Sequence, residues 1–566
     1  NAAGEYILPQ LPVGVYTLTV SSPQFEAQVV TNISVDANSN IKEVVSLQLG
    51  SSKETVTVVD SSGTAIDANS ATLGTLIDTK LIEDLPIDGH NAVALSALLP
   101  GVVDVNAPTT TTGDTSGPTY SASGSRNTQN LMLFDGLMWN NLFFNTGINY
   151  PPPNALQEVS VQLNNYKAEY GRNAGSVFNV VTRAGSNTIR GTVWDYIQNS
   201  YFNAADYISK VNPKDNINQW GFTLGGPVLK DKLYYFGAFQ GLIGRLQNSG
   251  EIFPIGLAER GLLPNGQPRP CTTPGPFPGL ACASFAADVA TAASGLGKFV
   301  NPLDVTGNSN GATADNVTSM MNAAYQQAGG TGTSPCLALL SQAAVYAASN
   351  PYGSIPTKVQ ATYMPNAEVP VQCLNPVMLN VLNTFAPTLQ NAGNGLDAET
   401  RSNAPTTDQN ALARMDYTLN GKHSFDARYN LIHSTAVTVP GVNSSSQGVA
   451  SYATLNASSE SNFGNVGWKW VITPNLLNDM RFGYKRFESK QFPRDNRTLN
   501  DFGGNFVVPG IPTLPEFNFS NAFALGSTSQ GFQDHINENV ELNESLSWTK
   551  GNHSIKGGFQ FLRLQY

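Results

Sequence analysis

The chain has 566 residues, of which 13% are charged, and its formal net charge is -10. A nucleic-acid partner is excluded because no cluster of lysine and arginine accompanies this acidic balance. The mean hydropathy of -0.17 and the lack of any run near the ~18 apolar residues of a spanning helix exclude a helical membrane protein. With 20 tyrosines and 27 phenylalanines, the composition fits a membrane β-barrel and equally fits a secreted, soluble β-rich protein.

Residues 4–49 alternate between apolar and polar positions, with turn residues such as Pro12 and Pro23 between the runs. This pattern predicts a small antiparallel β-sandwich. Since the chain begins within the pattern, we expect the first strands of the sandwich to be missing. Asp36 begins a spacing typical of calcium loops, but Ile41 stands where such a loop needs glycine, so we expect a plain hairpin turn there.

Residues 51–62 form a polar linker around a short β-prone core. The core residues are Glu54, Thr55, Val56, Thr57 and Val58. An extended, β-branched peptide with free backbone groups can add as a strand to the sheet edge of another protein. The segment is therefore predicted to bind a partner by strand addition, and the alternative is an ordinary linker strand.

Residues 63–187 have the features of a compact domain. Apolar residues between positions 70 and 105, including Leu76, Ile77, Leu81 and Ile82, follow helical spacing. Asp135-Gly136 predicts a hairpin turn. Residues 158–163 and 176–182 alternate as strands, and the segment between them carries two charges, Glu169 and Arg172.

From residue 188 onward the chain alternates long aromatic strands with long polar loops. In one strand Ala413, Met415 and Tyr417 share a face, and Arg414 and Asp416 share the other; residues 425–431 and 477–487 repeat the pattern. Short turns alternate with long loops, as in outer-membrane barrels, and charged inward faces require a wet or plugged interior. We expect about nine strands, and because an open membrane sheet exposes two edges, we expect the native chain to continue past Tyr566.

Residues 242–408 interrupt the strands and are too long to be structureless. We expect an extracellular insertion with short helices at residues 285–295, 317–327 and 336–349. It contains all four cysteines: Cys271, Cys282, Cys336 and Cys373. Two disulfides in an oxidising compartment are expected; pairing Cys271 with Cys282 and Cys336 with Cys373 closes the shorter loops, and the other two connectivities stay open. The insertion is predicted to recognise a ligand, or else to be a protective cap.

No catalytic constellation is recognisable. His535 and Glu538 have the spacing of a zinc peptidase, but they lie at a predicted loop-to-strand border, and only His553 is near enough in sequence to supply a third ligand. No nucleophile elbow, phosphate loop or dinucleotide fingerprint occurs. We therefore predict that the protein is not an enzyme and that it holds no metal and no cofactor.

Several strings resemble parts of the TonB-dependent outer-membrane receptors. GEYILPQLPVGVYTLTVSSPQF is similar to a carboxypeptidase regulatory-like module, and ETVTV (residues 54–58) resembles the TonB box. LPIDGHNAVALSALLPGV, SGSR and FDG resemble landmarks of the plug domain, and NQWGFTLGGPVLKDKLYYFGAFQG resembles an early barrel hairpin. The order of these motifs resembles the Oar-like subgroup.

This resemblance implies a mainly β fold: a transmembrane antiparallel β-barrel, incomplete in this chain, with an N-terminal plug and a small β-sandwich. The implied domains are residues 1–50 (regulatory-like sandwich), 51–62 (linker with TonB box), 63–187 (plug) and 188–566 (partial barrel with the insertion 242–408). Glu169 and Arg172 are then expected to join plug to barrel wall, although a catalytic pair is the other reading.

The resemblance further implies a transporter in the bacterial outer membrane. Its expected partners are a TonB-type energy transducer with its inner-membrane motor, outer-membrane lipid, and an extracellular substrate such as a glycan, peptide or siderophore. Proton-motive force is expected to drive transport, and neither the substrate nor the direction, import or export, follows from these motifs. The alternative is a surface adhesin or structural barrel without energised transport.

Overall fold

The computed structural model describes a defined part of the chain. The described residues are 14–35, 55–59, 73–85, 92–105, 119–252, 282–284, 368–370, 376–385, 398–438, 455–504, 517–519, 523–525, 532–550 and 553–566, apart from positions 24, 206, 208–211 and 213, together with a few isolated residues. Among them, no helix is both long and apolar enough to cross a membrane.

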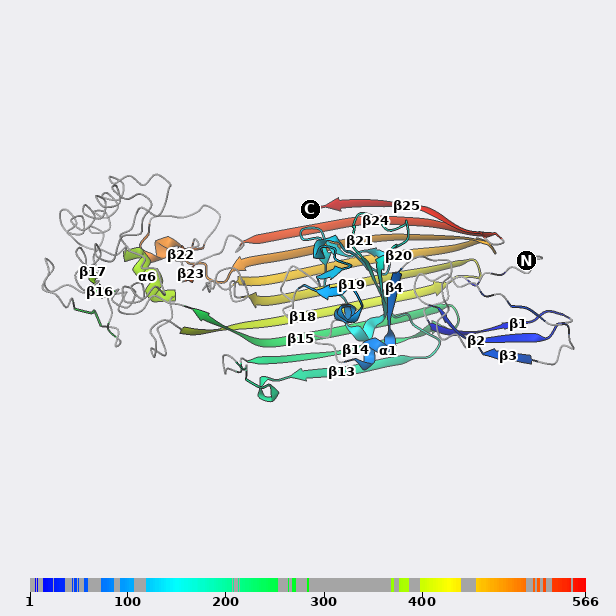
Figure 1. The fold of residues 1–566 in the computed structure, drawn as a ribbon, viewed down its shortest axis with the longest axis horizontal. Coiled ribbons are helices and arrows are strands. Elements are labelled where there is room, and N and C mark those ends of the chain that lie inside the picture. The colour runs from blue at the N-terminus through cyan, green and yellow to red at the C-terminus, as the bar shows by residue number, and fades with distance from the viewer. Residues whose placement is uncertain are drawn as a thin grey trace.

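The largest unit is a nine-stranded antiparallel sheet, which we call the wall (Figure 1). In spatial order its strands are β13 (Arg190–Gln198), β14 (Asp215–Leu229), β15 (Leu233–Ile252), β18 (Ala398–Thr418), β19 (His423–Thr438), β20 (Leu455–Thr473), β21 (Leu476–Pro493), β24 (Gln533–Lys550) and β25 (His553–Gln565). Sequence order is kept throughout, and the number of strands agrees with the prediction. The described sheet does not close, so β13 and β25 are its two edges.

The two faces of the wall differ as the alternation predicts. On β18, Leu412 is 3% exposed and faces inward, whereas Met415 is 48% exposed and faces outward. On β21, Phe482 and Tyr484 keep 47% and 39% of their surface exposed, so no second layer of the described chain covers them. An exposed aromatic outer face on strands of 9 to 21 residues is what a lipid-facing barrel wall requires.

Aromatic residues gather on the outer face near the short turns. The rings of Trp468 and Trp470 stack with centroids 5.7 Å apart, and His423 lies 5.8 Å from Trp470. On β24, the Lys550 ammonium lies 5.6 Å from the centroid of Trp548. Aromatic girdles of this kind mark the level of a membrane interface in outer-membrane barrels.

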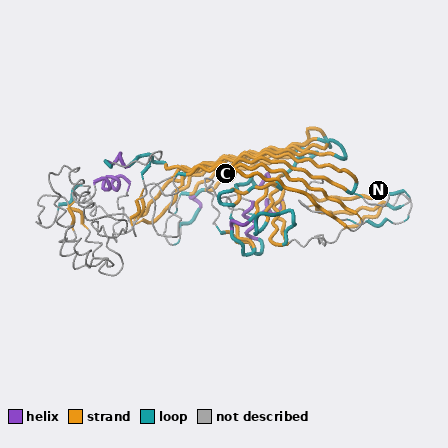
Figure 2. Tube along the Cα trace, turned by 90° about the horizontal axis from the view of Figure 1, so that it is seen from above, coloured by secondary structure: helices purple, strands orange, loops and turns teal. Residues whose placement is uncertain are grey.

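A second, five-stranded sheet packs with short helices into a compact unit, which we call the plug. Its strands in spatial order are β4 (Leu73–Asp78), β11 (Leu156–Asn164), β12 (Val177–Thr182), β7 (Leu131–Phe134) and β8 (Leu137–Met138). All pairs are antiparallel except β12 with β7. Figure 2 shows the plug against one face of the wall. Phe134, Trp139 and Phe178 are fully buried in its core.

One prediction in the plug was wrong. Leu76 and Ile77 lie on β4, where a helix was expected, and pair with Ser160 and Val159 of β11. The helical spacing of neighbouring apolar pairs also fits a buried strand, and the open edge of β11 satisfies the backbone of β4. The helix α1 (Thr79–Asp84) begins only afterwards, and the 3-10 helix η2 (Ala92–Leu98) follows it.

Short elements complete the plug and the long connections. They are β5 (Val102–Asp104), β6 (Tyr120–Ala122), η3 (Asn127–Gln129), β9 (Asn140–Asn141), β10 (Thr146–Gly147), η4 (Pro153–Ala155), η5 (Ser200–Phe202), β16 (Cys282–Ser284), β17 (Glu368–Pro370), α6 (Pro376–Phe385), η9 (Leu499–Phe502), β22 (Phe517–Phe519) and β23 (Phe523–Leu525).

The insertion between β15 and β18 is shorter than the range 242–408. β15 continues to Ile252 and β18 begins at Ala398, because these two strands stay paired over 20 residues, well past the length that a membrane needs. The three helices expected at 285–295, 317–327 and 336–349 lie outside the described residues. The helix α6 was not predicted.

A three-stranded sheet forms the N-terminal unit. β1 (Gly14–Val20) pairs antiparallel with β2 (Ala27–Val35), and β3 (Thr55–Val59) pairs parallel with the other edge of β2. Figure 1 shows this sheet beyond the end of the wall where the short turns lie.

Candidate functional site at the interface of plug and wall

The turn between β7 and β8 brings the plug to the wall. Asp135 and Gly136 both adopt positive φ, 50° and 84°, the combination that two-residue hairpin turns need and that aspartate and glycine tolerate best. The turn is fixed from within the plug, because the Asn179 side-chain oxygen accepts a hydrogen bond from the Gly136 N–H at 3.0 Å. As a result the Asp135 carboxylate, 3% exposed, is held between plug and wall.

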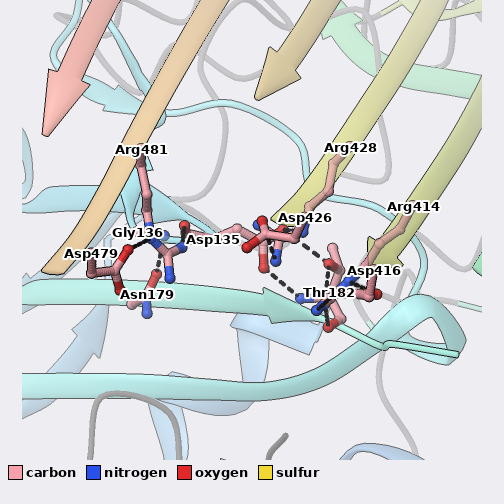
Figure 3. A network of polar contacts seen from close by, with 10 residues as sticks. All are labelled: Asp135, Gly136, Asn179, Thr182, Arg414, Asp416, Asp426, Arg428, Asp479 and Arg481. Carbon is pink, nitrogen blue, oxygen red and sulfur yellow. Dashed lines mark hydrogen bonds and ion pairs between the residues drawn. The ribbon is translucent and has the colours of Figure 1, made fainter. Parts of the chain in front are cut away.

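Both oxygens of Asp135 are engaged (Figure 3). Oδ1 accepts from the Thr182 N–H at 3.0 Å, and Oδ2 accepts from the Thr182 hydroxyl at 2.9 Å. Oδ2 also lies 3.4 Å from Nε of Arg428 on β19, and the Asp135 carbonyl accepts from Nη1 of Arg481 on β21 at 2.6 Å. A single turn therefore connects one plug strand with two wall strands.

Three wall arginines face this turn, and each has an aspartate two residues away on its own strand. Residues i and i+2 share one face of a strand, so each pair points inward together. Arg414 and Asp416 form two parallel 2.8 Å hydrogen bonds; the Arg428–Asp426 and Arg481–Asp479 ion pairs measure 3.3 and 3.4 Å. Arg414 also donates to the Thr182 carbonyl at 2.6 Å.

With Lys469, which interacts electrostatically with Asp426 and Asp479, these groups form a balanced set that we call the charged network. Its four cations are Arg414, Arg428, Lys469 and Arg481, and its four anions are Asp135, Asp416, Asp426 and Asp479. Only Asp135 belongs to the plug. Buried charges are tolerated only when they are paired, so the wall depends on the plug for one anion.

A second polar contact lies beside the charged network. The Met138 N–H donates to Oε2 of Glu541 on β24 at 2.9 Å, and Nζ of Lys485 on β21 donates to the Asn140 carbonyl at 2.5 Å. Lys485 is 1% exposed, and its Nζ lies 5.8 Å from the Trp139 ring centroid. The backbone of β8 and β9 is thus bonded to β24 and, at a second point, to β21.

Apolar packing accompanies these polar contacts. Phe463 of β20 lies 5.3 Å, between ring centroids, from both Phe134 and Trp139 of the plug. All three side chains are at most 2% exposed. The interface therefore combines a buried aromatic contact with hydrogen bonds and ion pairs between charged groups. Moving the plug requires breaking both kinds of contact.

The predicted plug–wall residues take different places. Glu169 Oε2 lies 2.5 Å from Nζ of Lys556 on β25, so this carboxylate contacts the wall. Arg172, with a φ of 68°, donates to Sδ of Met138 at 3.2 Å, a contact inside the plug. Its pKa is lowered because burial disfavours the charged guanidinium.

The other predicted site residues lie largely away from this interface. Thr55, Val56, Thr57 and Val58 are on β3, paired with β2, and Glu54 is outside the described residues. Cys282 is on β16 opposite Pro370 of β17, and the other three cysteines are outside the described residues.

The zinc-peptidase spacing does not produce a site. His535 and Glu538 lie on opposite faces of β24: the His535 ring contacts Phe143 of the plug on the inner side, and Glu538 accepts a hydrogen bond from Tyr484 on the outer side. In the described part of the chain, no three histidine, cysteine or acidic side chains converge as metal ligands would.

The charged network itself was missed. The inward faces of 411–419 and 424–431 were predicted correctly, but the partners of their arginines were not. A signal for the network was present in the sequence: Arg-Met-Asp, Asp-Ala-Arg and Asp-Met-Arg occur in three of the predicted strands. Each triplet has an arginine and an aspartate on the same face of its strand, so the three strands can carry similar ion pairs side by side.

Comparison with known proteins agrees with this architecture. Residues 68–177 match the TonB-dependent Receptor Plug Domain, and residues 181–328 and 303–566 match the Outer membrane beta barrel domain. The TonB-dependent transporter Oar of Myxococcus xanthus is 30% identical over 279 residues, which cover 46% of this chain and 25% of that protein.

Two solved structures are similar in fold. They are the outer membrane transporter YddB from Escherichia coli (12% identity, TM-score 0.43, 86% of this chain and 47% of that one) and the ferric enterobactin receptor PfeA from Pseudomonas aeruginosa (10% identity, TM-score 0.42, 87% and 48%). The chain spans about a quarter of the length of Oar and about half of each of these receptors.

Proposed function

The chain belongs to the TonB-dependent receptors of the bacterial outer membrane, with a plug and an outer-membrane β-barrel domain, and from this premise we propose that it serves energised transport of a substrate across that membrane. Receptors of this family are not enzymes. The observation that carries the proposal is the contact between plug and wall. The Asp135-Gly136 turn of the plug supplies the fourth anion of the charged network on the inner face of the wall.

We propose that the transducer binds residues 54–58 and pulls on the chain that leads to β4. Residues 55–58 of the segment lie on β3, which has one edge on β2. Among the described strands no other pairs with the second edge of β3, which supports strand addition there. It lies at the end of the wall with the short turns, which in outer-membrane barrels is the periplasmic end. Force applied there reaches the plug before the wall.

The domain limits and the subgroup belong to the same proposal. Residues 1–50 are proposed as a carboxypeptidase regulatory-like module, supported by the antiparallel pair β1–β2 and by the bridge between Phe25 and Leu49. Residues 51–62 are proposed as the linker with the TonB box, 63–187 as the plug and 188–566 as the partial barrel. Similarity to Oar supports placing the chain near that transporter.

Uptake by whole cells tests the proposal. Deleting residues 54–58 should abolish uptake of labelled candidate substrates to the level seen with a protonophore, while the protein remains in the outer membrane. Val56→Pro should have the same effect because proline removes a backbone N–H needed for strand pairing, and Val56→Ala is the matched control that should transport normally. Undiminished uptake by the deletion variant would favour an adhesin or structural barrel instead.

A further inference from the structure

The connection between plug and wall is short. The last plug strand, β12, ends at Thr182, and the first wall strand, β13, begins at Arg190. We call residues 183–189 between them the linker. It lies against the hairpin of β14 and β15, which contains the Gly-Gly-Pro motif at residues 225–227 and the short turn at residues 230–232. Neither the motif nor the turn belongs to the charged network, so the network does not explain them.

Gly185 brings the linker against the backbone of β15. A Cβ atom at this position would overlap the Tyr235 carbonyl oxygen and would lie 2.9 Å from Cβ of Tyr234. On the neighbouring strand, a Cβ atom added to Gly225 would lie 3.7 Å from Cα of Gly185. An approach this close to a strand backbone requires glycine, so the linker and the Gly-Gly-Pro motif meet without side chains between them.

Two residues further on, the linker is bonded to the turn of the same hairpin. The Asn187 side-chain amide donates to Oδ1 of Asp231 at 2.6 Å, and the Asp231 N–H donates to Oδ1 of Asn187 at 2.9 Å. Asp231 has a φ of 62°, a left-handed conformation in which aspartate and asparagine are enriched. The reciprocal pair therefore joins the linker to both a side chain and the backbone of the turn.

The other end of the linker is held by the plug. The Arg183 N–H donates to the Ala155 carbonyl, and Nε of Arg183 donates to the Leu156 carbonyl, both at 2.9 Å. Arg183 is thus bonded to the plug and Gly185 is packed on the wall. Ala184 is the single residue between these two sets of contacts.

The two ends of the plug are attached differently. At the N-terminal end, β4 is an edge strand that pairs only with β11 among the described strands. At the C-terminal end, β12 lies between β11 and β7 and leads directly into the linker. A pull on the chain that leads to β4 therefore loads the weakly held end first and the linker last.

We propose that Gly185, Asn187 and Asp231 are positioning residues that keep the linker fixed to the β14–β15 hairpin while the plug is displaced. Ala184 is then the pivot of the movement. The inference rests on the proposed function, in which the plug moves, and it specifies which part of the attachment does not move. An anchored end limits the displacements open to the plug and returns the Asp135 turn to the charged network.

Hydrogen exchange of the purified full-length protein in detergent micelles tests the inference. Urea is added in steps, and mass spectrometry with fragmentation of the peptides resolves the Asp231 amide. At the lowest urea concentration at which β7 and β8 lose protection, we expect Asp231 to exchange as slowly as without urea. Asn187→Ala removes the acceptor and supplies the unprotected rate. Loss of protection at Asp231 together with β7 and β8, or an unprotected rate at Asp231 before urea is added, would overturn the inference.

Closure of the pore in planar bilayers gives a second readout, which reports positioning rather than stability. We expect urea to open a conductance by displacing the plug and removal of urea to close it. Gly185→Ala should displace the linker from β15, which lengthens the flexible connection from Ala184 alone to residues 184–189. Because effective concentration falls roughly as the −3/2 power of the length of a flexible connection, closure should become about tenfold slower.

Gly171→Ala is the matched control for this change. Gly171 also belongs to the plug, but a Cβ atom added there would meet nothing within 4 Å. The pore of this variant should close as fast as that of the unaltered protein. Closure of Gly185→Ala at the unaltered rate would contradict the anchor.

Exchanging the two side chains of the reciprocal pair separates a specific contact from general damage. Asn187→Asp places two carboxylates side by side, and their repulsion should raise exchange at position 231 to the unprotected rate. Adding Asp231→Asn restores protection, because the new amide can donate to the new carboxylate and the backbone N–H keeps its acceptor. If the double variant stays unprotected, Asn187 and Asp231 do not anchor the linker.

The inference and the proposed function fail separately. The exchange and closure measurements need neither a transducer nor a substrate. Uptake that ignores the deletion of residues 54–58 would refute energised transport and leave the anchor standing. Energised uptake by a protein whose linker leaves the hairpin together with the plug would refute only the anchor.

Discussion

Two levels of the same inner wall use polar residues in different ways. At the level of the plug turn, cations and anions are paired as ions across the interface, although Nε and Nη1 of buried Arg428 make no hydrogen bond. A few residues further along the same strands, three rows of inward-facing residues run from Asn410, Asp408 and Thr406 on β18 across to β24 and contain no lysine or arginine. In these rows, which we call the outer zone, buried Ser461, Ser489 and Asn537 have polar atoms with no partner in the described structure.

The comparison shows that burial alone does not reveal the role of a polar residue. A charge inside the wall is stable only where it is paired. The plug supplies Asp135 as one of the four anions, so the charged network marks where the plug contacts the wall. Neutral polar groups cost less when unpaired, so they can be buried without a partner. The predictions below test this difference, from the largest expected effect to the smallest.

Neutralising the plug aspartate should have the largest effect. Asp135→Asn keeps the shape of the turn but removes the anion beside Arg428, whose side chain is 5% exposed. Removing one partner of a buried ion pair costs roughly 3–5 kcal/mol. We expect this cost to weaken the binding of the plug to the wall. We expect faster hydrogen exchange at β7 and β8 and ion conductance through planar bilayers that contain the protein.

A matched change on the wall separates this effect from charge loss in general. Asp195 is exposed on the edge strand β13, and Asp195→Asn should leave exchange and conductance as in the unaltered protein. If Asp135→Asn shows neither ion conductance nor faster hydrogen exchange at β7 and β8, the charged network does not hold the plug in place.

Removing the buried lysine should cost less. Lys485→Met eliminates the donor to the Asn140 carbonyl, and the expected loss is about 1.5–3 kcal/mol. Glu541 keeps donors from Met138, Asn543 and Gln560, which limits the damage. Urea unfolding of the protein in micelles measures the change.

A double-mutant cycle sharpens this prediction. If Lys485 and Glu541 compensate each other, Lys485→Met combined with Glu541→Gln should be less destabilised than the sum of the single variants. Strict additivity would mean that the two groups act independently.

Sequence patterns predicted much of the fold because they report local geometry. Alternation assigned Arg414 and Asp416 to the inner face and Met415 to the outer face, and Asp135-Gly136 marked a turn, since only a few residue types tolerate positive φ. Both predictions concern neighbours in the chain, and both are confirmed by the structure.

The partners of those residues were not predictable in the same way. Arg481 donates to a carbonyl 346 positions away. The alternation of residues along a strand shows which face a side chain occupies but not which residue lies opposite it. Leu76 and Ile77 were wrongly expected in a helix because the edge of β11 that captures them lies more than 80 residues further on. Tertiary pairing decided both cases.

The outermost plug contact should matter only slightly. Glu169 and Lys556 are 33% and 46% exposed, and exposed ion pairs contribute about 0.2–1 kcal/mol. Glu169→Gln should therefore lower the urea midpoint slightly at low salt. The difference should vanish at 1 M salt, where the screening length is about 3 Å; a loss as large as that of Asp135→Asn would place this pair among the contacts that seat the plug.

The smallest effect on stability is expected from Ser489→Ala in the outer zone. Its hydroxyl is buried without a partner in the described structure, so its removal should change the free energy of unfolding by no more than about 0.5 kcal/mol. Ser176 is the matched control, because it is equally buried in the plug but donates to the Leu163 carbonyl at 3.4 Å. Ser176→Ala should cost about 0.5–1.5 kcal/mol. If Ser489→Ala proves the more damaging change, the outer zone is held together by its polar groups, as the plug level is, and the contrast between the two levels of the wall disappears.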